Sequence, residues 1–454
     1  MTDEAHMDMN PADLDLIDTV LGQIPVHLRK RGLLLGFSGG LDSTVLLHLL
    51  CRLRDLGRIG PFSAMHVHHG LQAEADRWVE HARNVTGMQH VPLMIERVSV
   101  VLASGRGIEA AAREARHAAL EAGMEEGGAV FTAHHQDDQA ETFMLQLMRG
   151  AGVRGLSAMP AIAPFGKGWQ LRPLLGVTRE RLHGYACAHG LTWIEDPSNL
   201  DGAFARNHLR NQVFPSLMEH WPRTSRTLAR AARRMAATES LLGDLARIDL
   251  EQARTEDNFR ITVSGLLGLS DERLHNAVRG WLHELDFPAP PEPRLRELRH
   301  MLRAREDAMP MLQWAGHALR RWHGHLYAMR VMPAPGPLDR SWDAGAPLDL
   351  PELGVRIIPQ WTAGRGLGMA AIQRHGLSVR LRRGGERLRL AGQPHHSSLK
   401  HLLQAAGIPP WERARMPLFF MGETLAMAGE SWTSAEWAAS PDEDGLSIRR
   451  VPLA

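Results

Sequence analysis

The segment of the chain most suited to chemistry is SGGLDS at residues 38–43, which follows an apolar run and opens a stretch with helical spacing. Its two glycines allow close approach of the backbone to a ligand, its serines supply hydroxyl donors, and unpaired N–H groups at a helix start attract anions. A plain strand-to-helix turn would use similar residues, and the pattern is not GxxxxGK[ST]. Asp42 favours a phosphate site, because a carboxylate in an anion cradle makes sense where Mg²⁺ bridges it to the ligand. The segment therefore predicts a phosphate-binding loop.

A second polar segment, AHHQDDQAET at residues 133–142, follows another strand-like run and enters a helix. Asp138 and Glu141 are three residues apart and share one face of that helix. Asp137 stands at the helix start, where it can act as a cap. Two histidines and three carboxylates could also form a metal site, although their spacing is not HExxH. A capped helix on the surface, with no functional role, is a further alternative. The segment predicts a carboxylate cluster in the same domain as the phosphate loop.

The elements that must position these segments alternate between strand and helix. LLLGF at residues 33–37 is a short apolar run before glycines, which suits a buried parallel strand. Repeated alternation predicts an α/β fold with a doubly wound parallel sheet, in which ligands bind at the carboxyl ends of the strands. The predicted strands are 33–37, 62–68, 91–98 and 129–133, and the predicted helices are 41–56, 73–87, 107–123 and 137–148.

The second half of the chain begins with helices, predicted at 207–219, 223–250, 271–285 and 294–305. The long helix at 223–250 begins with a series of five arginines, which could form a solvated surface or bind a phosphate backbone: Arg223, Arg226, Arg230, Arg233 and Arg234. Strands are predicted near 311–319, 325–331 and 378–383, and a helix at 399–406. Residues 332–368 are rich in Pro and Gly, which indicates linker or irregular β structure. We therefore predict a catalytic domain at 1–222, a mainly helical domain at 223–332, a linker at 333–375 and a small α+β domain at 376–454.

The composition excludes several classes of protein. The 454 residues are 44% hydrophobic and 23% charged, which is typical of globular rather than disordered or fibrous chains. No run approaches the roughly 18 apolar residues of a membrane helix, and the first ten residues carry three acids without Lys or Arg, unlike a secretory signal. Two cysteines exclude a disulfide framework and four-cysteine metal or iron–sulfur sites. We expect a cytoplasmic protein with no membrane contact and no disulfide-linked partner.

SGGLDS resembles the PP-loop of the N-type ATP pyrophosphatases, and AHHQDDQAET resembles a motif of the tRNA(Ile)-lysidine synthetase family within that superfamily. The resemblance extends over nearly the whole chain and matches the three-domain form of the family, although many relatives have asparagine where this chain has His68. The further matching segments are HVHHGL (66–71), GIEAAAREAR (107–116), LRPLL (171–175), EDPSN (195–199), RNHLR (206–210), GGERLRLAG (384–392) and IPPWERARMPL (408–418).

The resemblance implies a ligase that uses ATP and Mg²⁺ to modify the wobble cytidine in the CAU anticodon of tRNA(Ile). ATP would activate the 2-carbonyl oxygen of the base as an adenylate, and the side-chain amine of free L-lysine would displace AMP to give lysidine. The modified base pairs with A rather than G, so codon reading changes from AUG to AUA. The second and last domains would contact the tRNA.

The same resemblance implies roles for individual residues. ATP would be bound by Ser38, Gly39, Gly40, Leu41, Asp42, Ser43 and His66. Lysine or the base would be bound by Asp138, Glu141, Arg206, Asn207 and Arg210, with the choice between the two arginines left open. The implied catalytic residues are Asp42, Asp138, Glu141 and Arg206, and the implied Mg²⁺ ligands are Asp42 and Asp137.

Three other interpretations fit parts of the sequence. A PP-loop tRNA thiolase would need cysteines for sulfur transfer or a cluster, but Cys51 and Cys187 lie in separate predicted helices without a CxxC motif. A small-molecule amidating ligase would not explain the arginine-rich second half. A noncatalytic tRNA-binding protein could keep the loop as scaffold, but the intact Asp42, Asp138 and Glu141 argue against it.

Overall fold

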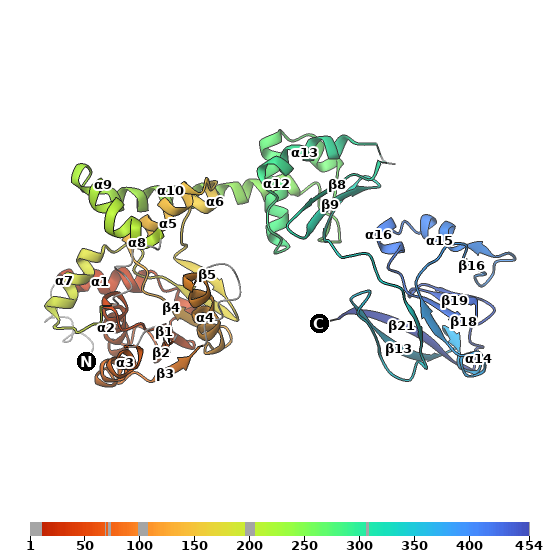
Figure 1. Cartoon of the computed structure of the whole chain (residues 1–454), viewed down its shortest axis with the longest axis horizontal. Helices are drawn as coiled ribbons and strands as arrows, with labels where there is room; N and C mark the ends of the chain where they lie inside the picture. Colours follow the sequence, from red (N-terminus) through yellow and green to blue (C-terminus); the bar gives the residue numbers. More distant parts are fainter. Residues whose placement is uncertain are drawn as a thin grey trace. The chain divides into compact units, whose positions relative to one another are not determined.

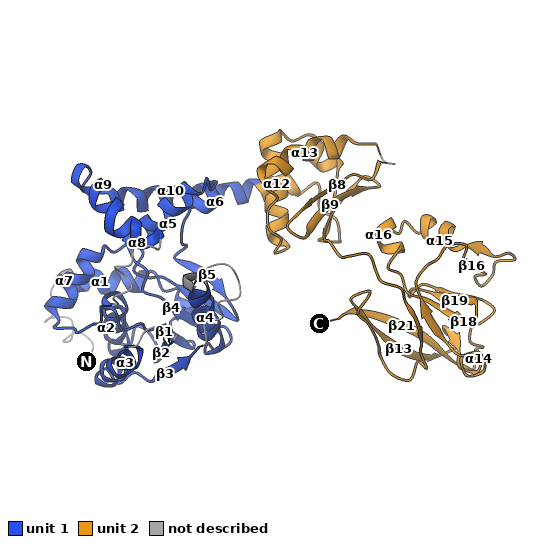
Figure 2. Cartoon of the chain, in the orientation of Figure 1, with its two compact units in different colours: residues 1–245 blue, residues 246–454 orange. Residues whose placement is uncertain are grey.

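The computed structural model describes residues 11–453 except 69, 71–73, 99–107, 196–204 and 306–307. It contains two compact units, Met1–Leu245 and Ala246–Ala454, which are coloured separately in Figure 2. Among the described residues, no helix is both long enough and apolar enough to cross a bilayer.

The first unit is built on a six-stranded sheet with strand order β3-β2-β1-β4-β6-β5. All neighbouring strands are parallel except the β5–β6 pair. The strand order changes direction between β1 and β4, and the crevice at such a switch point is where ligands bind in open α/β sheets. The strands are β1 (Leu33–Gly36), β2 (Phe62–His68), β3 (Leu93–Arg97), β4 (Ala129–Phe131), β5 (Ile162–Phe165) and β6 (Gly168–Leu171).

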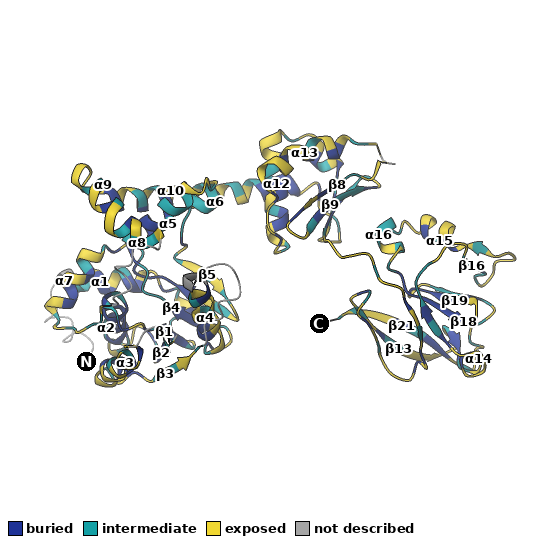
Figure 3. Ribbon diagram, viewed as in Figure 1, coloured by how far each residue is buried: buried dark blue, intermediate teal, exposed yellow. Residues whose placement is uncertain are grey.

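Helices pack on both faces of this sheet (labels in Figure 1), and its central strands β1 and β4 are almost wholly buried (Figure 3). Leu33 and Leu35 of β1 lie in a core with residues of α1, α2, α3 and α7, whereas Leu34 packs with Met65 and with Leu120 of α4. Successive side chains of a strand point to opposite faces. The apolar run at 33–37 therefore faces two helical layers, and the prediction of a doubly wound sheet is confirmed. The helices are α1 (Pro11–Gly22), α2 (Leu41–Asp55), α3 (Ala75–Met88), α4 (Ile108–Ala122), α5 (Gln136–Met148), α6 (Val153–Leu156) and α7 (Arg179–Ala188).

A second group of helices packs on α5 within the same unit. Helices α8 (Ala205–His208) and α9 (Phe214–His220) are joined by one π-helical turn, Leu209–Val213. Helix α10 (Thr224–Leu250) follows, and its Leu228 packs with Leu209, Phe214 and Ala140 of α5. The compact unit ends at residue 245, so most of α10 belongs with the catalytic domain rather than with a second domain that begins at 223.

The second unit opens with α11 (Ser264–Leu267), α12 (Asp271–Glu284) and α13 (Glu292–Arg303), which pack on a four-stranded sheet of order β7-β10-β9-β8. The strand predicted near 311–319 is two strands, because Ala315 and Gly316 have φ values of 39° and 78°. Positive φ at both central residues is typical of a tight hairpin turn. The strands are β7 (Arg260–Thr262), β8 (Met311–Trp314), β9 (His317–Trp322) and β10 (His325–Arg330).

Residues 333–375 are not a linker, because more than half of them lie in four strands and one helix of the last folded region. Strand β13 (Val355–Ala363) pairs with β21 (Asp444–Pro452) over nine residues, and Ile357 and Leu367 are fully buried. Pairing with a strand about 90 residues later in the chain outweighs the local turn preference of Pro and Gly. The other elements of this region are β11 (Asp339–Ser341), β12 (Leu348–Leu350), β14 (Leu367–Gly368), α14 (Met369–His375), β15 (Ser378–Arg380), β16 (Arg387–Leu388), β17 (Ser397–Ser398), α15 (Leu399–Ala405), α16 (Pro410–Arg413), β18 (Leu418–Met421), β19 (Thr424–Ala428) and β20 (Trp432–Thr433).

Candidate active site

The predicted phosphate loop lies between β1 and α2. Gly39 has a φ of 82°, in the region that favours glycine, and Gly40 is the N-cap of α2. Because Gly40 has no side chain, no side-chain acceptor caps the first N–H groups of α2. Ser38 accepts a hydrogen bond from the Gly40 amide, and its Oγ lies 3.0 Å from Ser43 Oγ. The loop thus combines uncapped amides with two hydroxyls, which is the donor set of an anion cradle.

Asp42 lies in the first turn of α2, and one of its oxygens has no partner. Its Oδ1 is buried without a hydrogen bond, whereas its Oδ2 lies 3.6 Å from His135 Nε2. A buried carboxylate oxygen without a donor is energetically unfavourable unless a cation or donor approaches it. The position therefore suits a cation bound together with a phosphate.

The second segment begins directly after β4, and His135 rather than Asp137 is the N-cap of α5. The backbone N–H of His135 donates to Asp138 Oδ2 at 3.0 Å, and the Asp137 amide lies 3.2 Å from His135 Nδ1. The prediction of Asp137 as the cap is wrong. Its carboxylate instead accepts the backbone N–H of Arg179 at 2.9 Å, which ties α5 to the start of α7.

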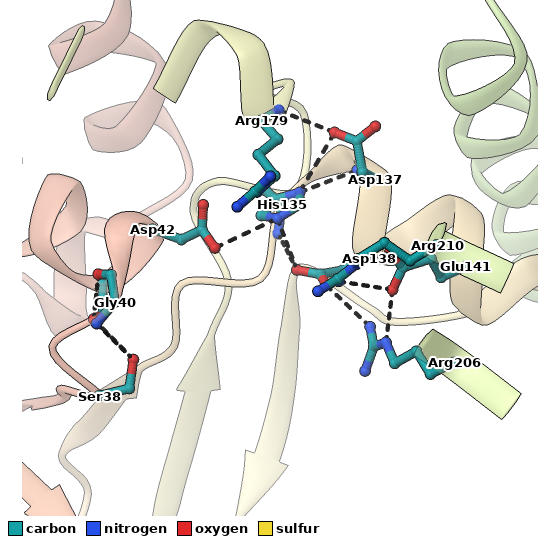
Figure 4. Close-up of polar contacts among 11 residues, drawn as sticks. Ser38, Gly40, Asp42, His135, Asp137, Asp138, Glu141, Arg179, Arg206 and Arg210 are labelled. Atoms are coloured by element: carbon teal, nitrogen blue, oxygen red, sulfur yellow. Dashed lines mark hydrogen bonds and ion pairs between the residues drawn. The ribbon is translucent and has the colours of Figure 1, made fainter. Parts of the chain in front are cut away.

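His135 lies at the centre of three carboxylates, as Figure 4 shows. Asp137 Oδ2 is 3.6 Å from its Nδ1, and Asp138 Oδ2 is 3.5 Å from the Nε2 that also faces Asp42. Burial opposes protonation of the ring, but the nearby carboxylates of Asp137, Asp42 and Asp138 outweigh it and raise the pKa of His135 to about 10. When the ring is protonated, the Nδ1 atom carries a hydrogen and faces the carboxylate of Asp137. It then cannot accept a hydrogen bond from the Asp137 backbone amide. Asp42 and Asp137 therefore face opposite nitrogens of one ring.

Asp138 and Glu141 bind two arginines from the α8–α9 segment. Arg206 donates to Glu141 Oε2 at 2.7 Å and to Asp138 Oδ1 at 3.1 Å. Arg210 donates to Glu141 Oε1 at 2.7 Å, to Glu141 Oε2 at 3.0 Å and to Asp138 Oδ1 at 3.1 Å. The two arginines between which the sequence left the choice open thus belong to one network, in which two guanidinium groups balance two carboxylates.

A cavity of about 900 Å³ connects the loop with this network. Asp138 and Arg210 are among its lining residues, but Glu141 and Arg206 are not, and the Glu141 side chain is only 4% exposed. His66 lines the cavity and donates from Nδ1 to the Phe37 carbonyl at 3.0 Å. The other predicted residues in the lining are Ser38, Gly40, Leu41, Asp42 and Ser43. Asp138 thus faces the cavity, with Glu141 behind it.

One wall of the cavity is basic, and its function was not predicted from the sequence. Arg113, Arg116 and His117 of α4 line it, next to His134. Burial lowers the pKa of His134 to about 3 against the opposing effect of Asp138, and burial and Arg113 lower the pKa of Arg172 to about 10. The arginines of GIEAAAREAR were the available signal, but their spacing equally suits a solvated helix face.

Several residues of the matching motifs lie outside the described part of the chain. They are His69 and Leu71 of HVHHGL, Gly107 of GIEAAAREAR and residues 196–199 of EDPSN, together with the acidic first ten residues.

Three family models match successive parts of the chain. A PP-loop domain matches residues 15–217, a TilS substrate binding domain matches 262–327, and a TilS substrate C-terminal domain matches 377–450. These matches confirm that the α/β domain is of the PP-loop type.

Curated relatives match almost the entire chain. A tRNA(Ile)-lysidine synthase of Alkalilimnicola ehrlichii is 44% identical over 93% of this chain and 95% of its own length. One of Pseudomonas aeruginosa is 41% identical over 92% and 95%. Among solved structures, a U34-tRNA thiolase from Methanococcus maripaludis has a TM-score of 0.41 and 16% identity, over 49% of this chain and 78% of that one. That structural likeness is too weak to support a functional argument. The similarity to the full-length relatives is strong enough to assign the family.

Proposed function

The chain belongs to the tRNA(Ile)-lysidine synthase family, a family of ATP-using ligases that form lysidine in tRNA(Ile), and from this premise we propose the substrates and the residue roles. The substrates are free L-lysine and the wobble cytidine of the CAU anticodon. The observation that carries the proposal is the single cavity that the phosphate loop, Asp42 and Asp138 line together. An enzyme that couples ATP cleavage to transfer of an amine needs both groups around one reacting centre.

In the first step, the 2-carbonyl oxygen of the cytosine attacks the α-phosphorus of ATP, and pyrophosphate leaves. The loop amides and the hydroxyls of Ser38 and Ser43 bind the phosphates. The unpartnered Oδ1 of Asp42 would hold a Mg²⁺ ion, which would supply neutralisation of the charge that develops on pyrophosphate. Among the described residues, no group of three or more His, Cys, Asp or Glu side chains is arranged to hold a metal ion.

In the second step, the side-chain amine of lysine attacks C2 of the adenylated base, and AMP leaves with the former carbonyl oxygen. The ammonium of lysine must lose a proton before it attacks, and a carboxylate can both position it and accept a proton. Asp138 lines the cavity, which supports its assignment to the amine. Glu141 is buried behind it and positions Arg206 and Arg210.

The carboxylate of lysine requires a cationic partner elsewhere in the cavity. Arg206 is already bound to Glu141 and Asp138. We assign the carboxylate instead to the basic wall, in particular to Arg113. Such a separation of one acidic and one basic wall would select an amino acid with a cationic side chain.

The test is incorporation of labelled lysine into a tRNA(Ile) transcript with a CAU anticodon, in the presence of ATP and Mg²⁺. We expect lysine in this tRNA but not in a methionine tRNA, one AMP released per lysine, and loss of activity in Asp42→Asn. AMP release without lysine incorporation would contradict the lysine assignment, and equal labelling of both tRNAs would contradict the tRNA assignment. Arg113→Gln should raise the KM for lysine more than it changes kcat, and an unchanged KM would overturn its role.

A further inference from the structure

The first half of α10 and the residue directly before it present five arginines on one face. Residues 223, 226, 230, 233 and 234 follow the spacing of a helix face, and at 100° per residue they lie within an arc of about 100°. All five side chains are exposed. The series extends for roughly 16 Å along the helix at 1.5 Å per residue. This set of residues is the arginine stripe.

Packing of the opposite face of α10 keeps the stripe directed to solvent. Ala229 and Ala232 are buried, and Leu228 packs on the α8–α9 segment. Ser225 is buried and hydrogen-bonds Asp137 of α5. The start of the stripe is therefore joined to the helix that carries Asp138.

No carboxylate neutralises the stripe within the part of the chain that the structure describes. None of its arginines forms an ion pair there, and the first acidic residue along α10 is Glu239. Several exposed arginines elsewhere are paired, such as Arg279 with Glu292 and Arg294 with Glu297. Closely spaced like charges on a helix are destabilising, so the stripe needs an external anion for compensation.

An exposed tryptophan stands next to the stripe. Trp221 is the C-cap of α9 and its residue surface is 64% exposed. Its carbonyl accepts hydrogen bonds from the backbone N–H and the hydroxyl of Thr224, at 3.0 and 2.7 Å, so its backbone is held at the start of α10. An aromatic ring beside arginines is the combination that binds unpaired nucleotides, because bases stack on the ring and phosphates bind the guanidinium groups.

We propose that Trp221 and the arginine stripe form the docking surface for the anticodon stem-loop of the tRNA. Trp221 stacks on an unpaired loop base, and the arginines bind successive phosphates of the stem. This proposal rests on the proposed function for the identity of the RNA. It places the base that must leave the stack close to α5 and the cavity, because Ser225 links the stripe to Asp137.

The first experiment measures binding of a fluorescent anticodon stem-loop RNA to the full chain as a function of KCl concentration. Each phosphate contact adds about 0.7–0.9 to the slope of log affinity against log salt. The variant R226Q/R230Q/R233Q should lower that slope by about 2–3 and weaken binding at least tenfold at moderate salt. The matched control is R58Q/R77Q/R83Q, three exposed arginines around α2 and α3, which lie across the first unit from α10 in Figure 1. Equal slopes for the two triple variants would overturn the proposal.

The second experiment tests the stacking. Trp221→Leu should weaken binding of the stem-loop about tenfold with the salt slope unchanged, and Trp221→Phe should restore most of the affinity. The control is Trp169→Leu, a partly exposed tryptophan on β6. Unchanged binding in Trp221→Leu, or equal losses in the leucine and phenylalanine variants, would contradict stacking.

A third measurement separates this inference from the proposed function. An acceptor-stem hairpin should bind the stripe variant and the wild type alike, and a loss equal to that of the stem-loop would contradict docking of the anticodon arm. If the wild type incorporates lysine while the stripe variant binds and reacts normally, the docking surface is wrong and the function stands. If the wild type binds the stem-loop through the stripe but incorporates no lysine, the proposed function is wrong.

Discussion

The first unit contains two sets of arginines that lie close together in the sequence but in opposite environments. Arg206 and Arg210 are partly buried, with side chains 23% and 31% exposed, and share five hydrogen bonds with Asp138 and Glu141. The arginine stripe begins thirteen residues after Arg210, is exposed, and has no carboxylate partner among the described residues. The same side chain therefore stabilises the folded protein in one place and is available to a ligand in the other.

The difference follows from desolvation. A guanidinium removed from water needs fixed acceptors, and two carboxylates supply them to Arg206 and Arg210. An exposed guanidinium keeps its hydration and can exchange it for phosphate. Changes in the paired set should therefore reduce stability and catalysis together, whereas changes in the stripe should reduce RNA affinity without reducing stability.

The largest effect is expected for Glu141→Ala, which leaves both arginines with Asp138 as their only acceptor. Removal of one member of a buried ionic network typically costs about 3–5 kcal/mol. Denaturant unfolding of the first unit should show a loss of that size, together with loss of lysine incorporation. The control is Asp15→Ala, because the Asp15–Arg181 pair is exposed and should contribute less than about 1 kcal/mol. Equal losses for the two variants would show that the network is not effectively buried.

A smaller effect is expected for Arg206→Lys and Arg210→Lys. Lysine keeps the charge but cannot reproduce the forked hydrogen bonds to two carboxylates. We expect each variant to lose about 1–3 kcal/mol of unfolding free energy and at least tenfold in kcat/KM. A large loss for one variant and none for the other would contradict the equivalence of the two arginines.

Two histidines, His48 and His135, also differ in environment, and the difference affects how stability depends on pH. His48 is on α2, with its Nδ1 2.9 Å from the hydroxyl of Tyr185. Burial, with help from His189 and Arg52, lowers the pKa of His48 to about 4, in contrast to the raised value of His135. The imidazole of His48 therefore binds a proton more readily in the unfolded chain than in the folded protein. The contribution of the neutral His48 ring to the free energy of unfolding is complete above about pH 6.5 and is lost as the pH falls toward 4.

Because the His48 ring is not fully buried, we expect this pH-dependent loss to be about 1–2 kcal/mol. Urea unfolding at pH 7 and at pH 5 measures it, with His48→Gln as the comparison. The difference between the two pH values should be smaller in the variant. An identical pH dependence in both proteins would show that His48 does not contribute.

The smallest effect is expected for Arg230→Gln in the stripe. The substitution removes like-charge neighbours at i−4, i+3 and i+4, and each such pair destabilises a helix by about 0.2–0.5 kcal/mol. Unfolding at low salt should therefore show a slight gain in stability that disappears at high salt. A loss of stability would mean that Arg230 has a structural partner, and would remove the contrast with Arg206 and Arg210.

Much of the first unit could be predicted because its signals are local. The β1 run and the glycines of residues 39–40 specify a buried strand and a tight loop through side-chain hydrophobicity and backbone freedom. The predicted helix at 41–56 agrees with α2 within one residue. Helix capping was less predictable, because His135 and Asp137 are both polar and only the backbone path after β4 decides which of them occupies the N-cap position.

The region 333–375 illustrates the limit of local signals. Pro359 lies within β13 opposite Ile448, so a residue that usually interrupts strands is accepted in this sheet. The partner strand β21 lies far along the chain, and no periodicity near residue 359 reports it. The sequence pattern therefore indicated a linker where tertiary pairing forms a sheet.

The sequence by itself determined that this chain has a phosphate loop, a carboxylate-rich helix and an arginine-rich helix, in an order that resembles one enzyme family. Each of these features depends on residues within about ten positions of one another. Only the tertiary structure decided that Asp138 faces the cavity while Glu141 lies behind it, and that Arg206 and Arg210 are bound while the stripe is exposed. Those distinctions depend on contacts such as that between Glu141 and Arg206, 65 residues apart, and on which side of each helix is buried. Burial and long-range pairing are properties of the packed chain, because the same carboxylate or guanidinium has a different free energy in water and in the protein interior.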